Sequence, residues 1–164
     1  MVSGQRPRVV LHLLAGLLGV ALAWSSFGKE GQVFSTWEGL EADKCASIWL
    51  IRKFISPGAE IRFHRRGATI TDGIPFDTPD AQFRRYHNKA TFETLLKHYH
   101  LKDAKLNRIA RVVHDIEVNV WERKVMPETD KVSADLQAIL SMDDTQRALG
   151  KCVEYFDKWY SERL

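Results

Sequence analysis

The stretch Asp43–Ile55, Asp-Lys-Cys-Ala-Ser-Ile-Trp-Leu-Ile-Arg-Lys-Phe-Ile, decides the fold. If the segment is a helix that turns by about 100° per residue, its apolar side chains point to nearly every side. These side chains are Ala46, Ile48, Trp49, Leu50, Ile51, Phe54 and Ile55. A helix that is apolar on all sides lies inside a protein rather than on its surface. The sequence therefore predicts that this segment is a buried helix around which the other elements pack.

The predicted helix carries a cation, Arg52, on the same side as Cys45 and Trp49. A guanidinium group does not lose its proton in a protein, so a buried arginine needs an anionic partner. Two interpretations remain open. Arg52 either pairs with an internal aspartate or glutamate, or it lies in a pocket where it binds a substrate anion.

The N-terminal segment has the pattern of a secretory signal peptide. Arg6 and Arg8 precede an apolar run over residues 9–20, and residues 21–23 are Ala-Leu-Ala, as at a signal-peptidase site. The apolar run is short for a membrane span, which needs about 20 residues. We therefore expect residues 1–23 to be a cleaved signal peptide and the protein to be periplasmic. A retained N-terminal membrane anchor is the alternative.

The composition describes one domain with little net charge. The net charge of the 164 residues is +3, and removal of residues 1–23 takes away two arginines and no acid, which leaves +1. This balance, and the lack of a basic stripe mixed with aromatics, argue against a nucleic-acid partner. The two cysteines, Cys45 and Cys152, either form a disulfide in an oxidising compartment or remain two buried thiols.

The rest of the chain is predicted to be mainly α. Residues 24–42 lack sustained periodicity and are interpreted as a loosely packed N-terminal arm. Glu60–Arg65 alternates polar with apolar residues, and Ala68–Thr71 follows a turn, so the two are expected to form a small antiparallel β-hairpin. Helical patterns follow from Thr91 onward. We therefore predict a single compact helical domain over residues 43–164 with a minor β-hairpin region.

A second informative stretch lies in the helix predicted over Asp103–Lys124. Glu117 falls on the apolar face of this helix, beside Val113, where an isolated carboxylate is costly. Three explanations remain open. Glu117 pairs with Arg52, or it binds a metal together with His114 one turn earlier, or burial raises its pKa for acid–base chemistry.

Two more residues complete the predicted metal site. His87 precedes the helix that starts near Thr91, and Glu93 lies in its first turn. With His114 and Glu117 they offer ligands for a divalent metal such as iron, manganese or zinc. Each also has a simpler interpretation, His87 as an exposed loop residue and Glu93 as an acid stabilised by the helix dipole. No closely spaced metal motif such as His-Glu-x-x-His is present.

Several segments resemble, in order, the motifs of the chromate-resistance protein family. They are Asp43-Lys44, Trp49–Ile55, Ile74-Pro75-Phe76-Asp77, Thr91-Phe92-Glu93 and Val113-His114-Asp115. The likeness covers roughly Glu41 to Lys158. This family includes exported proteins and the C-terminal domains of cytoplasmic chromate regulators, and the leader fits the exported branch. The resemblance implies a protein exposed to anion or metal stress, without implying a reaction.

The chain also departs from the regulators. It has Ser47-Ile48 where they carry a Cys-Pro pair. It has Arg85-Tyr86 and Ala90 where they tend to show paired histidines and a cysteine. Cys45 is therefore not the motif cysteine, and neither thiol chemistry nor a paired-histidine metal site is carried over.

The sequence thus predicts an exported chromate-resistance-like protein with a polar pocket for an oxyanion, a divalent metal or both. Lys44, Trp49 and Arg52 are the predicted oxyanion-binding residues, while His114 and Glu117 would bind a metal or move protons. The alternative is a non-catalytic periplasmic accessory or metal-binding protein that works with a membrane transporter. In a third interpretation the charged residues only hold the fold. The sequence does not decide whether the protein is an enzyme.

Overall fold

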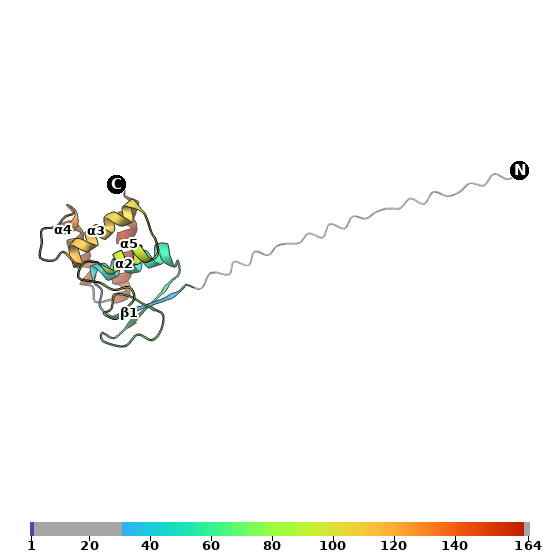
Figure 1. Ribbon diagram of the computed structural model, residues 1–164, viewed down its shortest axis with the longest axis horizontal. Coiled ribbons are helices and arrows are strands. Elements are labelled where there is room, and N and C mark those ends of the chain that lie inside the picture. The colour runs from blue at the N-terminus through green and yellow to red at the C-terminus, as the bar shows by residue number, and fades with distance from the viewer. Residues whose placement is uncertain (2–30, 163–164) are drawn as a thin grey trace.

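The computed structural model describes Met1 and residues 31–162 (Figure 1). Apart from Met1, the predicted signal peptide lies outside these residues. The helices are α1 (Ala42–Leu50), its π-helical continuation η1 (Ile51–Ile55), α2 (Thr91–His98), α3 (Ala104–Glu117), α4 (Thr129–Leu140) and α5 (Thr145–Ser161). The strands are β1 (Val33–Trp37), β2 (Glu60–His64) and β3 (Ile74–Pro75). None of the helices in the described part of the chain has both the length and the apolar composition that a membrane span needs.

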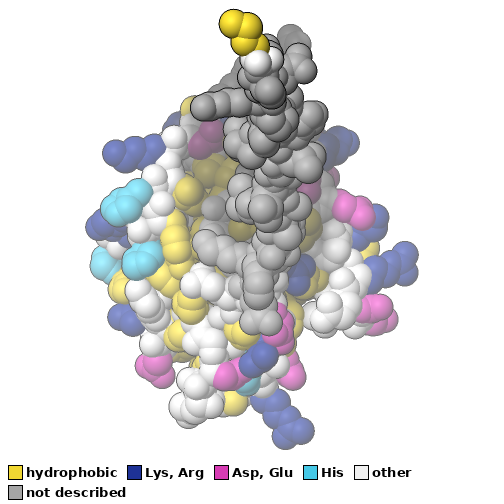
Figure 2. All heavy atoms as spheres, turned by 90° about the vertical axis from the view of Figure 1, so that its right-hand side faces the viewer, with side chains coloured by type: hydrophobic (Ala, Val, Ile, Leu, Met, Phe, Trp, Pro, Cys, Tyr) yellow, Lys and Arg dark blue, Asp and Glu magenta, His cyan; other side chains and the backbone are white. Residues whose placement is uncertain are grey.

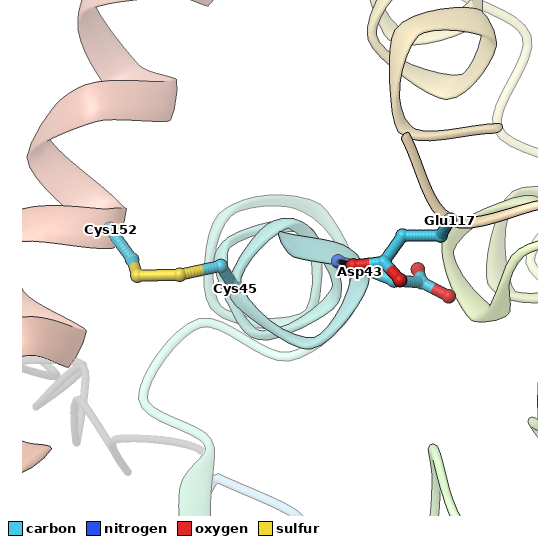
Figure 3. The surroundings of a disulfide bond; sticks show 4 residues. All are labelled: Asp43, Cys45, Glu117 and Cys152. Carbon is cyan, nitrogen blue, oxygen red and sulfur yellow. Dashed lines mark hydrogen bonds between the residues drawn. A yellow bond between two sulfur atoms is a disulfide. The ribbon is translucent and has the colours of Figure 1, made fainter. Parts of the chain in front are cut away.

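Helix α1 is the buried centre of the domain, as predicted. Every residue from Ala42 to Leu50 is buried, and the helix contacts α2, α3, α4 and α5. Figure 3 shows α1 end-on, with α5 on one side and the end of α3 on the other. The absence of a polar stripe is therefore explained by neighbours on all sides.

The sheet is parallel, so the predicted antiparallel hairpin is wrong. Strand β1 lies in the middle of the order β2-β1-β3, and both neighbours run parallel to it. Residues 68–71, the predicted second strand of the hairpin, form no strand. The alternation in Glu60–Arg65 correctly indicated a strand, but alternation does not identify the pairing partner. That partner is β1, because α1 and η1 form the helical crossover that parallel strands require.

Strand β1 also corrects the expectation of a loosely packed arm over residues 24–42. Phe34, Ser35 and Thr36 are fully buried, and the strand pairs on both edges. A central strand that is buried on both faces shows no polar–apolar alternation. Its sequence, Val-Phe-Ser-Thr-Trp, therefore lacked the period that would have marked it.

Helix α5 packs against α1 on the side opposite the end of α3 (Figure 3). Cys45 and Cys152 form a disulfide between α1 and α5, with their Cα atoms 5.6 Å apart. The indole Nε1 of Trp49 donates a hydrogen bond of 3.0 Å to Asp157, and its ring lies 5.7 Å from that of Phe156. The alternative of two separate thiols is thus excluded by the structure.

Helix α3 begins as predicted, with Asp103 accepting a hydrogen bond from the Leu106 amide, but it ends at Glu117 instead of Lys124. The chain turns back because Asp115 is buried and its carboxylate accepts hydrogen bonds from the amides of Val125 (2.7 Å) and Met126 (2.6 Å). Asp115 therefore holds the connection to α4, a role that the sequence did not indicate.

Candidate functional site

Charged side chains from distant parts of the sequence meet around the first turn of α2. We call them the charged cluster: Glu41, Asp43, Lys44, Asp77, Arg85 and Glu117. They come from the start of α1, the loops between β3 and α2, and the end of α3. Figure 3 shows two of them, Asp43 and Glu117, side by side on the face of α1 opposite the disulfide.

Asp43 supplies the N-terminal cap of α2. Its two carboxylate oxygens accept hydrogen bonds from the amides of Thr91 (2.6 Å) and Phe92 (2.9 Å). The residue at the N-cap position is Ala90, whose side chain has no acceptor, so these amides need one from elsewhere. Asp43 is fully buried. Its carboxylate thus joins the central helix to the start of α2.

Lys44 and Asp77 connect α1 to the sheet and to α2. The Lys44 ammonium donates hydrogen bonds to the carbonyl oxygens of Trp37 (2.9 Å) and Gly39 (2.7 Å), and lies 3.6 Å from the Asp77 carboxylate. Asp77 in turn accepts a 2.7 Å hydrogen bond from the Thr91 hydroxyl. Lys44 therefore fixes the turn between β1 and α1 while it neutralises a nearly buried acid.

Arg85 is the cation that pairs with Glu117. Its guanidinium lies 3.1 Å from Glu117, 2.7 Å from Glu41 and 3.8 Å from Asp43. The explanation in which Glu117 pairs with Arg52 is therefore wrong. The sequence correctly indicated that Glu117 is largely buried, but Arg85 lies in an aperiodic loop that gave no signal of where it points.

Burial dominates the protonation of the acids in the charged cluster. Loss of water raises the pKa of Asp43 to about 7, and the nearby Asp77 carboxylate adds to the rise. Burial also raises the pKa of Asp77, against the attraction of Lys44, and that of Glu117, against the attraction of Arg85. Clusters of acids with raised pKa values are typical of functional sites, although structural networks also produce them.

These shifts predict that the protein is less stable at pH 8 than at pH 5. A carboxyl group whose pKa is higher in the folded state binds its proton more tightly there, so its stabilisation is present below the unfolded-state pKa and is lost as the pH rises through about 7 for Asp43. We expect the free energy of unfolding in urea to fall by at least about 1 kcal/mol, the equivalent of one pKa unit. Asp43→Asn is the matched control, and an equal fall in that variant would contradict a contribution from Asp43.

Only two of the four predicted metal ligands contact each other. The His114 Nδ1 lies 2.8 Å from the Glu93 carboxylate, which also accepts a 2.7 Å hydrogen bond from the Ala90 amide. Glu117 instead pairs with Arg85, and His87 is exposed. Within residues 31–162, no three histidine, cysteine, aspartate or glutamate side chains are grouped to hold a metal ion. The four predicted ligands are therefore not brought together in one place.

The predicted oxyanion-binding residues are not brought together. Lys44 belongs to the charged cluster, whereas Trp49 is fully buried against α5. Arg52 lies on η1, where partial burial lowers its pKa, and no acid in the described part of the chain pairs with it. These three side chains thus do not form one site.

A cleft of about 620 Å³ opens beside the charged cluster. Its charged lining residues are Lys44, Arg66, Arg84 and Arg85, and Glu38, Glu41 and Asp77. The buried Nε of Arg85 has no hydrogen-bond acceptor among the described residues. The cleft is therefore the place where a ligand would reach the cluster from solvent.

The chain matches one known protein family over most of its length. The family described as ChrB, C-terminal domain, matches residues 34–163. The chain belongs to this family. Over 91 residues it is also 31% identical to Protein ChrB of Cupriavidus metallidurans. That match covers 54% of this chain but only 28% of the relative, so the chain corresponds to less than a third of the relative's length. No solved structure matches.

Membership of the ChrB C-terminal domain family confirms the resemblance to chromate-resistance proteins. The matched region runs from β1 to the end of α5 and so includes the whole charged cluster and the cleft. The motif that begins with Asp43-Lys44 thus contributes a cap for α2 and an ion pair in this ChrB-type domain.

Proposed function

We propose that this protein is an exported chromate-resistance protein that binds a small oxyanion, of the charge and size of chromate, in the cleft beside the charged cluster. Its family membership supports a role in chromate resistance. The Cys45–Cys152 disulfide supports an oxidising compartment, which agrees with the leader predicted over residues 1–23. The arrangement of arginines in the cleft carries the binding part of the proposal.

The cleft has more cations than anions, and its cations differ in how firmly they are held. Lys44 and Arg85 are held by buried acids and mark the inner end. Arg66 is 78% exposed and lies 3.7 Å from Glu41, while Arg84 packs with its guanidinium 4.7 Å from the centre of the Tyr86 ring. Arginine forks match the oxygens of a tetrahedral oxyanion. Arg66 is held only by Glu41, and Arg84 only by the Ala81 carbonyl at 3.4 Å and the Tyr86 ring, so both can turn toward an anion in the cleft.

Equilibrium dialysis of residues 24–164 against radiolabelled chromate tests the binding. We expect saturable binding that the double variant Arg66→Ala/Arg84→Ala weakens at least about tenfold, since each lost charge-assisted hydrogen bond is worth roughly 1.5–3 kcal/mol. Arg147→Ala, an exposed arginine in the first turns of α5, is the matched control and should bind as the wild type does. Equal binding by the double variant and this control would contradict the site. Sulfate competition measures whether the site distinguishes the two dianions.

Export is tested separately by the mass of the protein recovered from the periplasm. A mature form that begins at residue 24 is expected, and recovery of the full 164-residue chain from the cytoplasm would contradict this part of the proposal. The two tests fail independently, because the dialysis uses a chain that already lacks the leader.

A further inference from the structure

A second groove, of about 560 Å³, lies between the loop before α2 and the end of α2. Its lining residues are Gln82, Phe83, Tyr86, Asn88, Lys89, Thr94, Lys97, His98 and His100. None of them belongs to the charged cluster. None lines the cleft of about 620 Å³ in which oxyanion binding is proposed, which we call the oxyanion cleft. Its volume falls within the range of about 300–1,000 Å³ that small-molecule sites occupy.

The formally charged side chains that line this groove are both lysines, and the other ionisable nitrogen groups are histidines. Lys89, Lys97, His98 and His100 line it, and no aspartate or glutamate does. Within residues 31–162, no carboxylate forms an ion pair with any of these four side chains. The helix dipole explains a lysine in the last turn of α2, but not Lys89, which comes from the preceding loop. The groove therefore presents uncompensated positive charge.

Aromatic rings form the apolar part of the groove. Phe83 is only 3% exposed, and its ring lies 4.9 Å from that of His98 in an edge-on arrangement. Tyr86 is 41% exposed. The backbones of Tyr86 and Lys89 exchange hydrogen bonds of 2.8 and 3.4 Å, which hold an aromatic ring and a cation at the same turn. A flat apolar surface and a pair of lysines are thus already in place.

The positive surface continues past the groove. A neighbouring hollow shares Lys97 and His100 and adds Lys102 and Arg111, with Glu93 as its one acid. Figure 2 shows histidine side chains gathered beside lysine and arginine side chains along the left edge of the face in view. A long-range field of one sign raises the local concentration of anions near such a groove.

We propose that this groove binds a small organic anion with a flat aromatic body and a phosphate or carboxylate group. The aromatic body stacks on the exposed ring of Tyr86, and the anionic group meets Lys89 and Lys97. The site differs from the oxyanion cleft because its charges are unmatched and its floor is apolar, so an inorganic anion alone satisfies only half of it.

A titration followed by ¹H–¹⁵N correlation spectra tests the groove, with phenyl phosphate, inorganic phosphate and benzyl alcohol as probes. We expect phenyl phosphate to bind at least about fivefold more tightly than inorganic phosphate and to shift the amide signals of residues 82–89 and 94–100. Benzyl alcohol has the aromatic ring but no negative charge, and it should bind more weakly than phenyl phosphate. Equal affinities for phenyl phosphate and inorganic phosphate, or shifts confined to other residues, would overturn the proposal.

Variants separate the two halves of the site. Lys89→Ala/Lys97→Ala should weaken phenyl phosphate at least about tenfold, while Tyr86→Ala should remove the preference for phenyl phosphate over inorganic phosphate. Lys131→Ala, an exposed lysine on α4, is the control that removes a charge elsewhere. Arg66 lines the oxyanion cleft and not this groove, so Arg66→Ala should leave the titration unchanged. The test of the groove is therefore independent of the test of the proposed function. Loss of binding in either control variant would contradict a site at this groove.

Discussion

Asp43→Ala is expected to lower the free energy of unfolding by about 3–5 kcal/mol, the range found when one partner of a buried charged network is removed. The variant leaves the buried amides of Thr91 and Phe92 without their acceptors. It also removes the carboxyl group that lies 3.8 Å from the Arg85 guanidinium, although Arg85 keeps Glu41 and Glu117 as partners. Each of the two amides is left unsatisfied in the interior, which costs more than its hydrogen bond alone contributed. Urea unfolding followed by circular dichroism measures the loss.

Two variants separate the cap from the charge. Asp43→Asn keeps one carbonyl oxygen that can cap α2, so it should lose markedly less stability than Asp43→Ala. Ser47→Ala removes only the hydroxyl that donates a 3.3 Å hydrogen bond to Asp43 and should cost about 1 kcal/mol, as a single hydrogen bond does. An Asp43→Ala protein as stable as Ser47→Ala would show that α2 does not depend on this cap.

Replacement of both cysteines, Cys45→Ser/Cys152→Ser, is expected to cost about 3–5 kcal/mol. The bridge joins residues that are 107 positions apart. In the chain-entropy account, closing a loop of about 100 residues restricts the unfolded chain by up to about 4.7 kcal/mol. The hydroxyls also replace sulfur atoms in a fully buried site, which adds a smaller polar cost.

Reductant provides the control for this prediction. Dithiothreitol should lower the urea midpoint of the wild type toward that of the double variant and leave the double variant unchanged. If the intact mass of the non-reduced wild type equals that of the dithiol form, or if dithiothreitol shifts both proteins equally, the stabilisation does not come from the bridge.

The central helix could be predicted because the residues of a single segment indicate that it is buried. Apolar residues on every side of Asp43–Ile55 require neighbours all round, and four helices supply them. The burial of Glu117 followed from its place on an apolar face in the same way. Local patterns thus identified the burial of the central helix and of Glu117, but not that of β1 or Asp115.

Partners were harder to predict, because they are decided by contacts between distant segments. Arg85 approaches Glu117 from a loop without periodicity, and β1 lacks alternation because both its faces are covered. The role of Asp115 depends on a chain reversal that brings Val125 and Met126 back to it. The pairing of strands, the cations of the cluster and the turn after α3 therefore needed the three-dimensional structure.

The packing of α1 against α5 also has a consequence for the order in which the chain folds. One side of α1, the first helix of the domain, is covered by α5, the last helix. This contact is made by the Cys45–Cys152 disulfide and by the packing of Trp49 against Phe156. During synthesis, Ala42–Leu50 leaves the ribosome long before Thr145–Ser161 exists. We therefore expect that the core is completed only after translation of nearly the whole chain, and that until then an all-round apolar segment stays exposed to aggregation or to chaperones.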